Sequence, residues 1–439
     1  MVTRREFLED LAVGAAGLAV ASSARSYGQI IGSNDRLNFA VIGLNGRGYA
    51  HLSSLKANRS AARVSHVCDV DVAILAKFSD ATQREMGALP VSEKDFRRLL
   101  EKKDIDAITI ATPDHWHAPM AIAGLQAGKH VYLEKPCSHN PAEGVMLVEA
   151  QRKYGKLVQM GNQQRSSPHT IEIVTKIHAG LVGRPYAAKA WYANVRKSIG
   201  TGKEVPVPPQ LDWDLWQGPV PRRPYKDNLH PYNWHWFRIY GTGESLNNGT
   251  HEVDVCRWAL GVNFPQRVTA SGGRYHFKDD WQFYDTLVTS FEYKDKVISW
   301  EGNSCQGMKY YGRDRGSVIM GTEGTVLVDR DGYEVYDLKG TKTNEFKVGS
   351  TTSSTDLVGR DSMTDAHFAN FIAGIRKGEK LNAPVSEGNI AVTMLQLSNV
   401  AWETQRELHL DAKSGMILGD SEAMKMWGRE YEQGWALHV

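Results

Sequence analysis

The sequence predicts an α/β protein in two parts: an N-terminal doubly wound parallel sheet, and a C-terminal α+β domain with a large, open, mostly antiparallel sheet. Two observations support this division. Up to residue 160, short continuous apolar runs alternate with helical patterns, as in strands that helices bury on both faces. From residue 186 onward, longer alternating segments follow one another with few helices between them, as in a sheet with one exposed face.

The composition bounds the class of protein. The chain has 439 residues, more than one ordinary core holds, and 41% of them are hydrophobic. Its 52 basic and 50 acidic residues give a net charge of +2 without a basic stripe, so we expect no nucleic-acid partner. The four cysteines, at positions 68, 137, 256 and 305, form no CxxC pair, and we expect no metal site.

The first 24 residues have the pattern of an export signal. Arg4 and Arg5 precede an apolar stretch from Leu11 to Ala21, and small residues follow at positions 22–24. The stretch is too short to span a bilayer, and the paired arginines resemble a twin-arginine signal. A helix kept on the enzyme is the alternative, but the stretch has no polar face. We therefore expect residues 1–24 to direct export of the folded protein to the periplasm or another extracytoplasmic site, and no membrane segment in the mature chain.

A glycine-rich turn follows the first predicted strand, 37–42, and opens a helix. The turn, Gly43-Leu44-Asn45-Gly46-Arg47-Gly48, would let backbone N–H groups approach a pyrophosphate at the helix N-terminus. The second strand, 63–68, is followed by Asp69, about 20 residues beyond the turn, where a carboxylate accepts hydrogen bonds from an adenosine ribose. Because Val70 rather than an arginine follows, NAD is favoured over NADP, and Arg47 is the residue that could reverse this choice. We predict a Rossmann dinucleotide-binding domain over residues 36–160.

The other strands of this domain end in polar residues at the same edge. A capped helix at Phe96 precedes the strand 105–111, which leads into Thr112-Pro113-Asp114-His115-Trp116-His117. A helix over 117–127 precedes the strand 130–133, which leads into Glu134-Lys135-Pro136; the helix 142–154 and the strand 157–160 complete the domain. A lysine at a strand end is ordinarily solvated, but Lys135 faces the predicted cofactor edge, which favours a functional role, with a cis bond before Pro136.

These motifs resemble the signature of the Gfo/Idh/MocA family, which includes glucose–fructose oxidoreductase and inositol dehydrogenase. The glycine turn, A-T-P-D-H-W-H and E-K-P carry the resemblance, and together they cover the first third of the mature chain. The resemblance implies an NAD(P)-dependent oxidoreductase that acts on a hydroxyl group of a sugar, glycoside or polyol. It implies a cofactor site formed by Gly43, Asn45, Gly46, Arg47, Gly48, Asp69, Thr112, Asp114, His117, Glu134, Lys135 and Asn162.

A second chemical motif surrounds His251. His251 and Asp254 are spaced to share one face of a helix, and a histidine at a helix start can accept a proton. Alone, His251 would be interpreted as a helix cap, but the family order of motifs implies that it is the general base and that Lys135 binds the same hydroxyl. Many family members have Asp four residues before this histidine. This chain has Asn247 there, which can only position substrate or water.

The segment 206–240, called the arm below, is dense in Pro and Trp, which predicts neither regular helix nor strand but an ordered arm or active-site rim. Its tryptophans, at 213, 216, 234 and 236, could stack on sugar rings, and packing of the loop by its own aromatics is an equal alternative. Ahead of it, Gly161–Arg165 is similar to the family's switch into the second domain. The residues predicted to contact substrate are Arg165, His235, Trp236 and Asp254.

The second domain is predicted over residues 161–385. Its predicted strands are 186–195, 266–274, 286–293, 297–302, 317–320 and 326–328. Helical patterns at 365–372 and 387–408 are predicted to pack the domains together, with His367 structural and residues 386–439 forming a C-terminal helical segment. In the family the open sheet face joins protomers, so the resemblance implies a homodimer or homotetramer.

Two other functions remain open. The first is a glycosidase that uses bound NAD transiently, although in such relatives the histidine segment continues differently from His251-Glu252-Val253-Asp254. The second is a non-catalytic sensor that binds dinucleotide and sugar, which the intact Lys135 and His251 disfavour. Export adds an expectation: a cofactor that dissociated outside the cytoplasm would be lost, so we expect tightly bound NAD and redox-neutral turnover.

Overall fold

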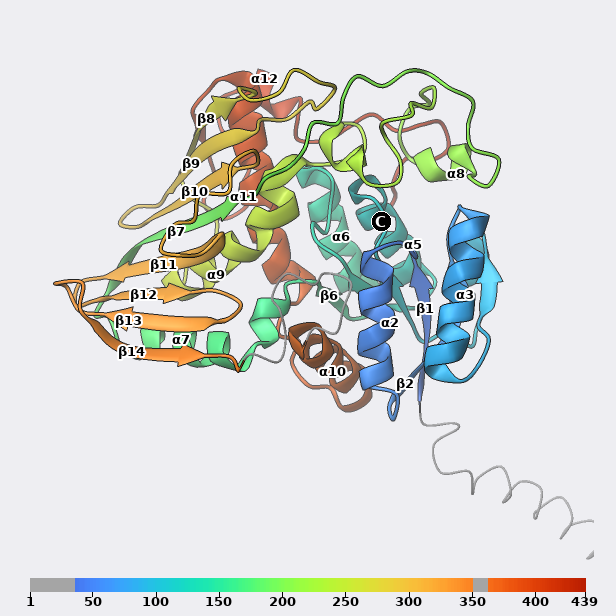
Figure 1. The fold of residues 1–439 in the computed structure, drawn as a ribbon, viewed down its shortest axis with the longest axis horizontal. Coiled ribbons are helices and arrows are strands. Elements are labelled where there is room, and N and C mark those ends of the chain that lie inside the picture. Colours follow the sequence, from blue (N-terminus) through green and yellow to red (C-terminus); the bar gives the residue numbers. More distant parts are fainter. Residues whose placement is uncertain (1–35, 350–361) are drawn as a thin grey trace, which may run out of the picture.

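The computed structural model describes residues 36–349 and 362–439, which form two sheets with helices around and between them (Figure 1). This arrangement confirms the predicted fold class. The export signal predicted for residues 1–24 lies outside the described residues. Within the two described ranges, no helix is long and apolar enough to cross a membrane.

The first sheet has six parallel strands in the order β3-β2-β1-β4-β5-β6. Its strands are β1 (Leu37–Ile42), β2 (Ala62–Cys68), β3 (Val91–Glu93), β4 (Ala107–Ile110), β5 (His130–Leu133) and β6 (Val158–Met160). Its helices are α2 (Arg47–Ala57), α3 (Val72–Met86), α4 (Phe96–Leu100), α5 (Asp114–Gln126) and α6 (Pro141–Tyr154).

Strand β1 is buried on both faces because its alternate side chains enter two different cores. Phe39 and Val41 pack with α2, α3 and α10 (Ser362–Lys377), whereas Ala40 and Ile42 pack with α5 and α6. Helix α5 begins at Asp114 rather than at His117 as predicted. A proline directly ahead of a helix costs no hydrogen bond there, so Pro113 serves as its N-cap.

The second sheet has nine strands in the order β14-β13-β12-β11-β7-β10-β9-β8-β15, and all neighbours pair antiparallel except β7 and β10. β13, β14 and β15 are additional to the predicted strands. The strands are β7 (Pro185–Ala193), β8 (Arg267–Gly273), β9 (Thr286–Glu292), β10 (Val297–Asn303), β11 (Arg315–Gly321), β12 (Thr325–Val328), β13 (Gly332–Tyr336), β14 (Lys342–Lys347) and β15 (Leu408–His409).

Helices α9 (Thr250–Leu260) and α11 (Val385–Thr404) pack against this second sheet, and α11 also contacts α6 of the first domain. Helix α7 (Pro168–His178) packs beside β13, and α10 lies against α2. After α11 the chain forms β15, the short helix α12 (Ser421–Met424) and irregular segments. The prediction that residues 386–439 form a helical segment is therefore correct only up to Thr404 and again for the four residues of α12.

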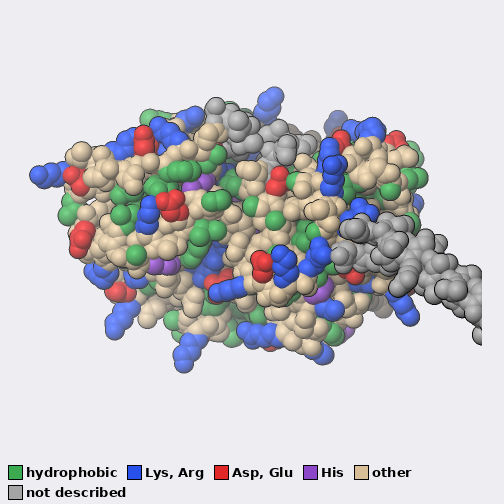
Figure 2. Space-filling view, turned by 90° about the horizontal axis from the view of Figure 1, so that it is seen from below, with side chains coloured by type: hydrophobic (Ala, Val, Ile, Leu, Met, Phe, Trp, Pro, Cys, Tyr) green, Lys and Arg blue, Asp and Glu red, His purple; other side chains and the backbone are tan. Residues whose placement is uncertain are grey.

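The arm crosses from the second sheet over the end of the first one (Figure 1). The prediction that it holds no regular helix is wrong in one place, because Asp212 caps a short helix, α8 (Trp213–Gln217), by accepting from the Leu215 N–H. A 3₁₀ turn, Asn233–Trp236, follows. On the face drawn in Figure 2, basic and acidic side chains are interspersed with hydrophobic and neutral ones.

Candidate active site

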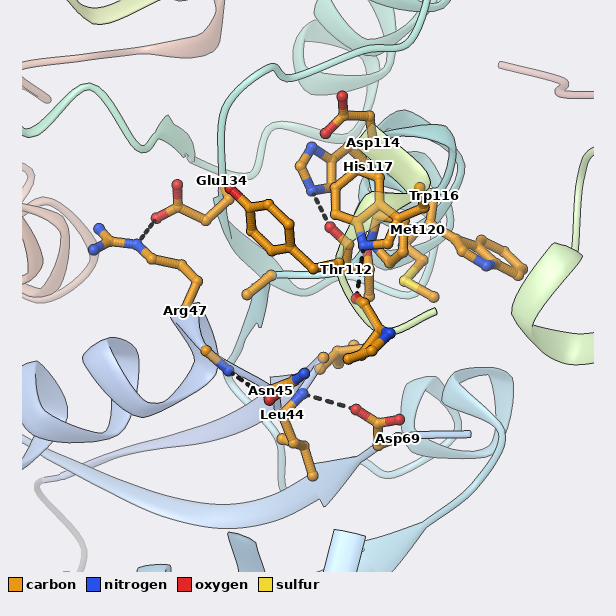
Figure 3. A pocket seen from close by; sticks show the side chains of 18 of the residues that line it. Leu44, Asn45, Arg47, Asp69, Thr112, Asp114, Trp116, His117, Met120 and Glu134 are labelled. Carbon is orange, nitrogen blue, oxygen red and sulfur yellow. Dashed lines mark hydrogen bonds and ion pairs between the residues drawn. The ribbon is translucent and has the colours of Figure 1, made fainter. Parts of the chain in front are cut away.

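A cavity of about 500 Å³ lies at the edge where the carboxyl ends of the parallel strands meet, which is where open parallel sheets bind ligands. Its walls come from the glycine turn, the loops after β2, β4 and β5, the arm, and the residues around the start of α9 (Figure 3 shows part of it). The predicted residues that line it are Gly43, Asn45, Gly46, Arg47, Asp69, Thr112, Asp114, His117, Glu134, Lys135, His235, Asn247 and His251.

The glycine turn fits tightly between β1 and the loop after β4. Gly43 has φ +83°, and a Cβ there would lie 2.6 Å from the carbonyl of Ala111. A Cβ on Gly48 would lie 2.5 Å from the carbonyl oxygen of Gly43. Neither position admits a side chain, whereas a Cβ on Gly46 would meet nothing within 4 Å. The turn therefore packs on the protein through two glycines and leaves the backbone at the third open to the cavity.

Asp69 lies beside the glycine turn (Figure 3). Its carboxylate accepts from the backbone N–H groups of Leu44, at 2.9 Å, and Asp71, at 3.0 Å. Burial raises the pKa of Asp69 to about 6, although these backbone hydrogen bonds oppose the rise. Above that pH the side chain presents a carboxylate to the cavity, as a ribose diol requires.

Arg47 lies on the other side of the cavity from Asp69 (Figure 3). Its Nε donates to Glu134 Oε1 at 2.7 Å, and its Nη2 donates to Thr364 Oγ1 at 3.2 Å. The guanidinium is thus bound away from the position that a 2′-phosphate beside Asp69 would take. This geometry agrees with the choice of NAD over NADP.

Glu134 is held by a pair of side chains from one face of α2. Besides Arg47, it accepts from His51 Nε2 at 3.1 Å, and His51 Nδ1 lies 3.1 Å from Thr109 Oγ1. Burial opposes ionisation of Glu134, but the charge of Arg47 and the His51 hydrogen bond outweigh it and hold its pKa well below the usual range. The prediction omitted His51, although Arg47 and His51 have the four-residue spacing that places side chains on one helix face.

The loop after β4 and the first turn of α5 supply three polar residues to the cavity. Asp114 Oδ2 accepts from Thr242 Oγ1 at 2.5 Å, which joins the two domains. His117 lies with Nδ1 2.6 Å from the Pro136 carbonyl oxygen and Nε2 2.8 Å from that of Thr112. The hydroxyl of Thr112 is buried and has no hydrogen-bond partner among the described residues. A buried polar atom of this kind is normally satisfied, so Thr112 Oγ1 indicates a ligand group in the cavity.

Lys135 meets Asn247 across the domain boundary. Its Nζ donates to the backbone oxygen of Asn247 at 2.6 Å and to the side-chain Oδ1 at 3.2 Å. Burial lowers the pKa of Lys135 to about 8, and the carboxylates of Glu134 and Asp114 oppose the fall. The bond before Pro136 is cis, as expected.

His251 lies in the first turn of α9 and also lines the cavity, with 6% of its surface exposed. Burial lowers the pKa of His251 well below its usual value, and the charges of Arg330 and Lys135 lower it further. The ring is therefore neutral at neutral pH and can accept a proton. Its Nδ1 is buried without a hydrogen-bond partner in the described part of the chain, and the Asn247 side chain bonds Lys135 instead.

The aromatic side chains of the arm mostly pack on one another. Trp213 and Trp216 stack with their ring centroids 4.7 Å apart, and Trp236 stacks on Trp281 at 3.8 Å. Trp216 and Trp234 also line the cavity, whereas Trp213 and Trp236 are not among its lining residues. Packing within the arm thus accounts for Trp213, and packing on Trp281, outside the arm, accounts for Trp236. A ligand could reach Trp216 and Trp234.

Five predicted residues are not among those that line the cavity: Gly48, Asn162, Arg165, Trp236 and Asp254. Arg165 and Asp254 instead bond each other: Nε donates to Oδ2 at 2.6 Å and Nη2 to Oδ1 at 2.9 Å, with both side chains buried. Burial of Asp254 is outweighed by the charge of Arg165, which holds the pKa of Asp254 below its usual value. This pair joins the segment after β6 to α9 and so stabilises the helix that carries His251.

Comparison with protein families gives two matches that together cover most of the described chain. Residues 37–162 match the oxidoreductase family with an NAD-binding Rossmann fold, and residues 188–437 match the C-terminal alpha/beta domain of the same oxidoreductase family. The second match alone spans more than half of the 439 residues.

Individual proteins show the same likeness. The inositol 2-dehydrogenase of Rubrobacter xylanophilus is 30% identical over 68% of this chain and 72% of that protein. A glycosyl hydrolase family 109 protein of Saccharopolyspora erythraea is 28% identical over a match that covers 45% of this chain and only 47% of that relative. A solved structure of levoglucosan dehydrogenase with NADH and levoglucosan covers 85% of this chain and 99% of its own, with 19% identity and a TM-score of 0.66, and shares the fold.

Proposed function

The chain belongs to the Gfo/Idh/MocA family of NAD-binding oxidoreductases, and on that basis we propose that it oxidises a hydroxyl group of a sugar, glycoside or polyol with NAD as the cofactor. The one observation that carries the proposal is the cavity itself. It brings Lys135, Asn247 and His251 together with the glycine turn and Asp69, although these groups come from two domains.

The cavity fits the dinucleotide at three points. The open backbone at Gly46 and the start of α2 would hold the pyrophosphate, and the carboxylate of Asp69 would hold the adenosine ribose. The unpartnered hydroxyl of Thr112 offers a hydrogen bond at the same edge of the sheet. When bound, the nicotinamide would take up the hydride from the substrate carbon.

The residues of the chain supply the proton chemistry. The neutral ring of His251 accepts the proton of the substrate hydroxyl, and the ammonium of Lys135 stabilises the negative charge that develops on that oxygen. Asn247 keeps Lys135 in place through its two oxygens, and it carries no charge of its own. Because these three groups meet at a partly buried site, their interactions with substrate are stronger than in water.

The relatives suggest the substrate class and one competing reaction. The inositol 2-dehydrogenase and levoglucosan dehydrogenase names point to cyclic polyols and anhydrosugars as the first compounds to test. The match to a family 109 glycosyl hydrolase supports, as a second candidate, glycoside cleavage through transient oxidation. Incubation of the purified protein with a panel of polyols, sugars and glycosides separates the two: oxidation gives a keto product, and cleavage gives a free sugar.

We further propose that the cofactor stays bound through turnover, and the arm supports this. The arm bonds the loop that follows Asp69: the Val72 N–H donates to the Gln210 carbonyl and the Asp212 N–H donates to the Val70 carbonyl, each at 3.0 Å. Farther along, Trp116 Nε1 donates to the Trp216 carbonyl at 2.8 Å. These bonds hold the arm across the mouth of the cavity that the cofactor would fill.

The C-terminal tail fastens the outer side of the arm. The Glu432 N–H donates to the Pro219 carbonyl at 3.0 Å, and Glu432 Oε2 accepts from the Arg222 N–H at 3.0 Å. Trp435 packs edge-on against Trp116, with ring centroids 5.1 Å apart. These contacts fix the position of the arm, and we therefore propose that they slow the release of a bound dinucleotide.

Export and assembly complete the proposal. Residues 1–24, with their paired arginines, would direct the folded, cofactor-loaded protein out of the cytoplasm. Fractionation of cells that express Arg4→Lys/Arg5→Lys tests this, because the variant should be retained inside.

The open nine-stranded sheet would join copies into a homodimer or homotetramer, and sedimentation of the purified protein would measure its oligomeric state.

A further inference from the structure

A π-helical turn, Ser245–Gly249, directly precedes α9. Such turns are rare in proteins, but those that occur are often found at functional sites, because they place side chains in positions that a regular helix does not allow. Here the turn carries Asn247, which bonds Lys135, and His251 follows in the first turn of α9. A contact that fixes the conformation of this turn therefore also fixes the position of Asn247, the partner of Lys135.

The side chain of Asn248 connects the turn to two arginine–glutamate pairs. Its Nδ2 donates to Glu244, and its Oδ1 accepts from Arg315 Nη1 at 3.3 Å. Glu244 is 1% exposed and is also bonded by Arg196, with Nη2 to Oε1 at 3.1 Å. Arg315 in turn donates through Nε to the buried Glu252 at 2.7 Å.

Both pairs are anchored in the second sheet. Arg315 is the first residue of β11, and Arg196 follows β7, where its backbone N–H donates to the Ser304 carbonyl at 2.8 Å. The amide of Asn248 thus bridges two side chains that are themselves held in place, Glu244 and Arg315. An amide can serve this place because it offers a donor to a carboxylate and an acceptor to a guanidinium at once.

We propose that Asn248 is a positioning residue that locks the π-helical turn and so holds the two oxygens of Asn247 on the Nζ of Lys135. The inference rests on the proposed function only for the catalytic importance of Lys135. Asn248 is not among the residues that line the cavity, so it acts through Asn247 rather than on substrate or cofactor.

The test compares Asn248→Ala and Asn248→Asp with the wild-type protein loaded with NAD. Trace labelling with acetic anhydride, read by mass spectrometry at the Lys135 peptide, reports how accessible and how basic that one amine is. Asn303→Ala is the matched control, because it also removes an asparagine-to-glutamate hydrogen bond, Asn303 to Glu301, but on the sheet. Titration with NADH and thermal unfolding check that each variant is folded and binds the cofactor.

An ammonium that donates to two oxygens is less accessible to the anhydride, and its protonated form, which does not react, is favoured. Asn248→Ala should therefore raise the labelling rate of Lys135 about fivefold, the factor that corresponds to the loss of one ordinary hydrogen bond. The affinity for NADH should not change. Asn248→Asp should also raise the rate, because its carboxylate would face that of Glu244, and it decides the matter if the alanine variant fails to fold. The Asn303 control should label like wild type. A folded, NADH-binding Asn248→Ala or Asn248→Asp protein that labels at the wild-type rate would overturn the proposal, whether or not a sugar is oxidised.

Discussion

The Nζ of Lys135, at the end of the fifth parallel strand, donates to both oxygens of Asn247, which lies in the turn ahead of α9. This contact joins the dinucleotide-binding domain to the second domain between two residues that both line the cavity. Asn247 carries an amide rather than a carboxylate, so this partner of Lys135 is neutral.

Replacing either catalytic group should abolish turnover without releasing the cofactor. Lys135→Ala and His251→Ala should each lower kcat by about 10²–10⁴-fold, the usual contribution of such a group, because each removes a proton acceptor or a charge at the reacting oxygen. NADH binding should persist, since neither residue builds the pyrophosphate site. A His251→Ala rate within about tenfold of wild type would exclude the general-base role.

The pH dependence should reflect Lys135, whose pKa burial lowers to about 8 from its ordinary 10.5. As the pH rises through 8, Lys135 loses the proton that makes it a cation, so kcat/KM should fall with the loss of one proton. In Lys135→Arg the residual activity should not fall over this range, because a guanidinium stays charged. A wild-type profile that stays level across this range would show that the charge of Lys135 does not take part.

Asp69 should decide between the two dinucleotides. Asp69→Ser removes the carboxylate that faces the cavity, so binding of NAD should weaken and the gap to NADP should narrow. In the wild-type protein, NADH should bind more tightly as the pH rises through about 6, where Asp69 ionises. Fluorescence titrations at several pH values measure both effects. Preferential binding of NADP by the wild-type protein would contradict this role.

The tail should control how fast the cofactor leaves. Glu432→Ala removes the carboxylate that accepts from the Arg222 N–H, so bound NADH should exchange severalfold faster with added NAD in a stopped-flow chase. Glu422→Ala is the matched control, because it also removes a glutamate from the C-terminal segment, in α12, but one that pairs with the exposed Lys425. Equal exchange rates in the two variants would mean that the tail does not hold the arm closed.

Much of the fold follows from the sequence because local signals agree with the tertiary structure. The strands at 37–42 and 130–133 match prediction to the residue, since apolar runs between glycines and polar turns leave little choice of boundaries. Strand β14 was missed because it is exposed along its whole length and shows no apolar face. Helix α5 begins three residues earlier than predicted because Pro113 is compatible with the position directly ahead of a helix.

The candidate site is less visible in the sequence because its contacts are long-range. The sequence order placed Lys135 and His251 near the cofactor edge, and both line the cavity. It could not show that Arg165 bonds Asp254, since a cavity wall and a buried ion pair use the same residue types. His51 shares a helix face with Arg47, but its partner Glu134 is distant in the sequence. Asn248 lies in a π-helical turn, which no periodicity signals.

The most direct test is the absorbance of the nicotinamide in NAD-loaded protein after addition of each compound of a panel that begins with myo-inositol and levoglucosan. We expect that at least one polyol or sugar reduces the bound cofactor within a single turnover, and that His251→Ala binds NAD but gives no such signal. If none of the panel changes the absorbance of the wild-type protein, or if His251→Ala responds as fast as wild type, the proposed oxidation at this site is contradicted.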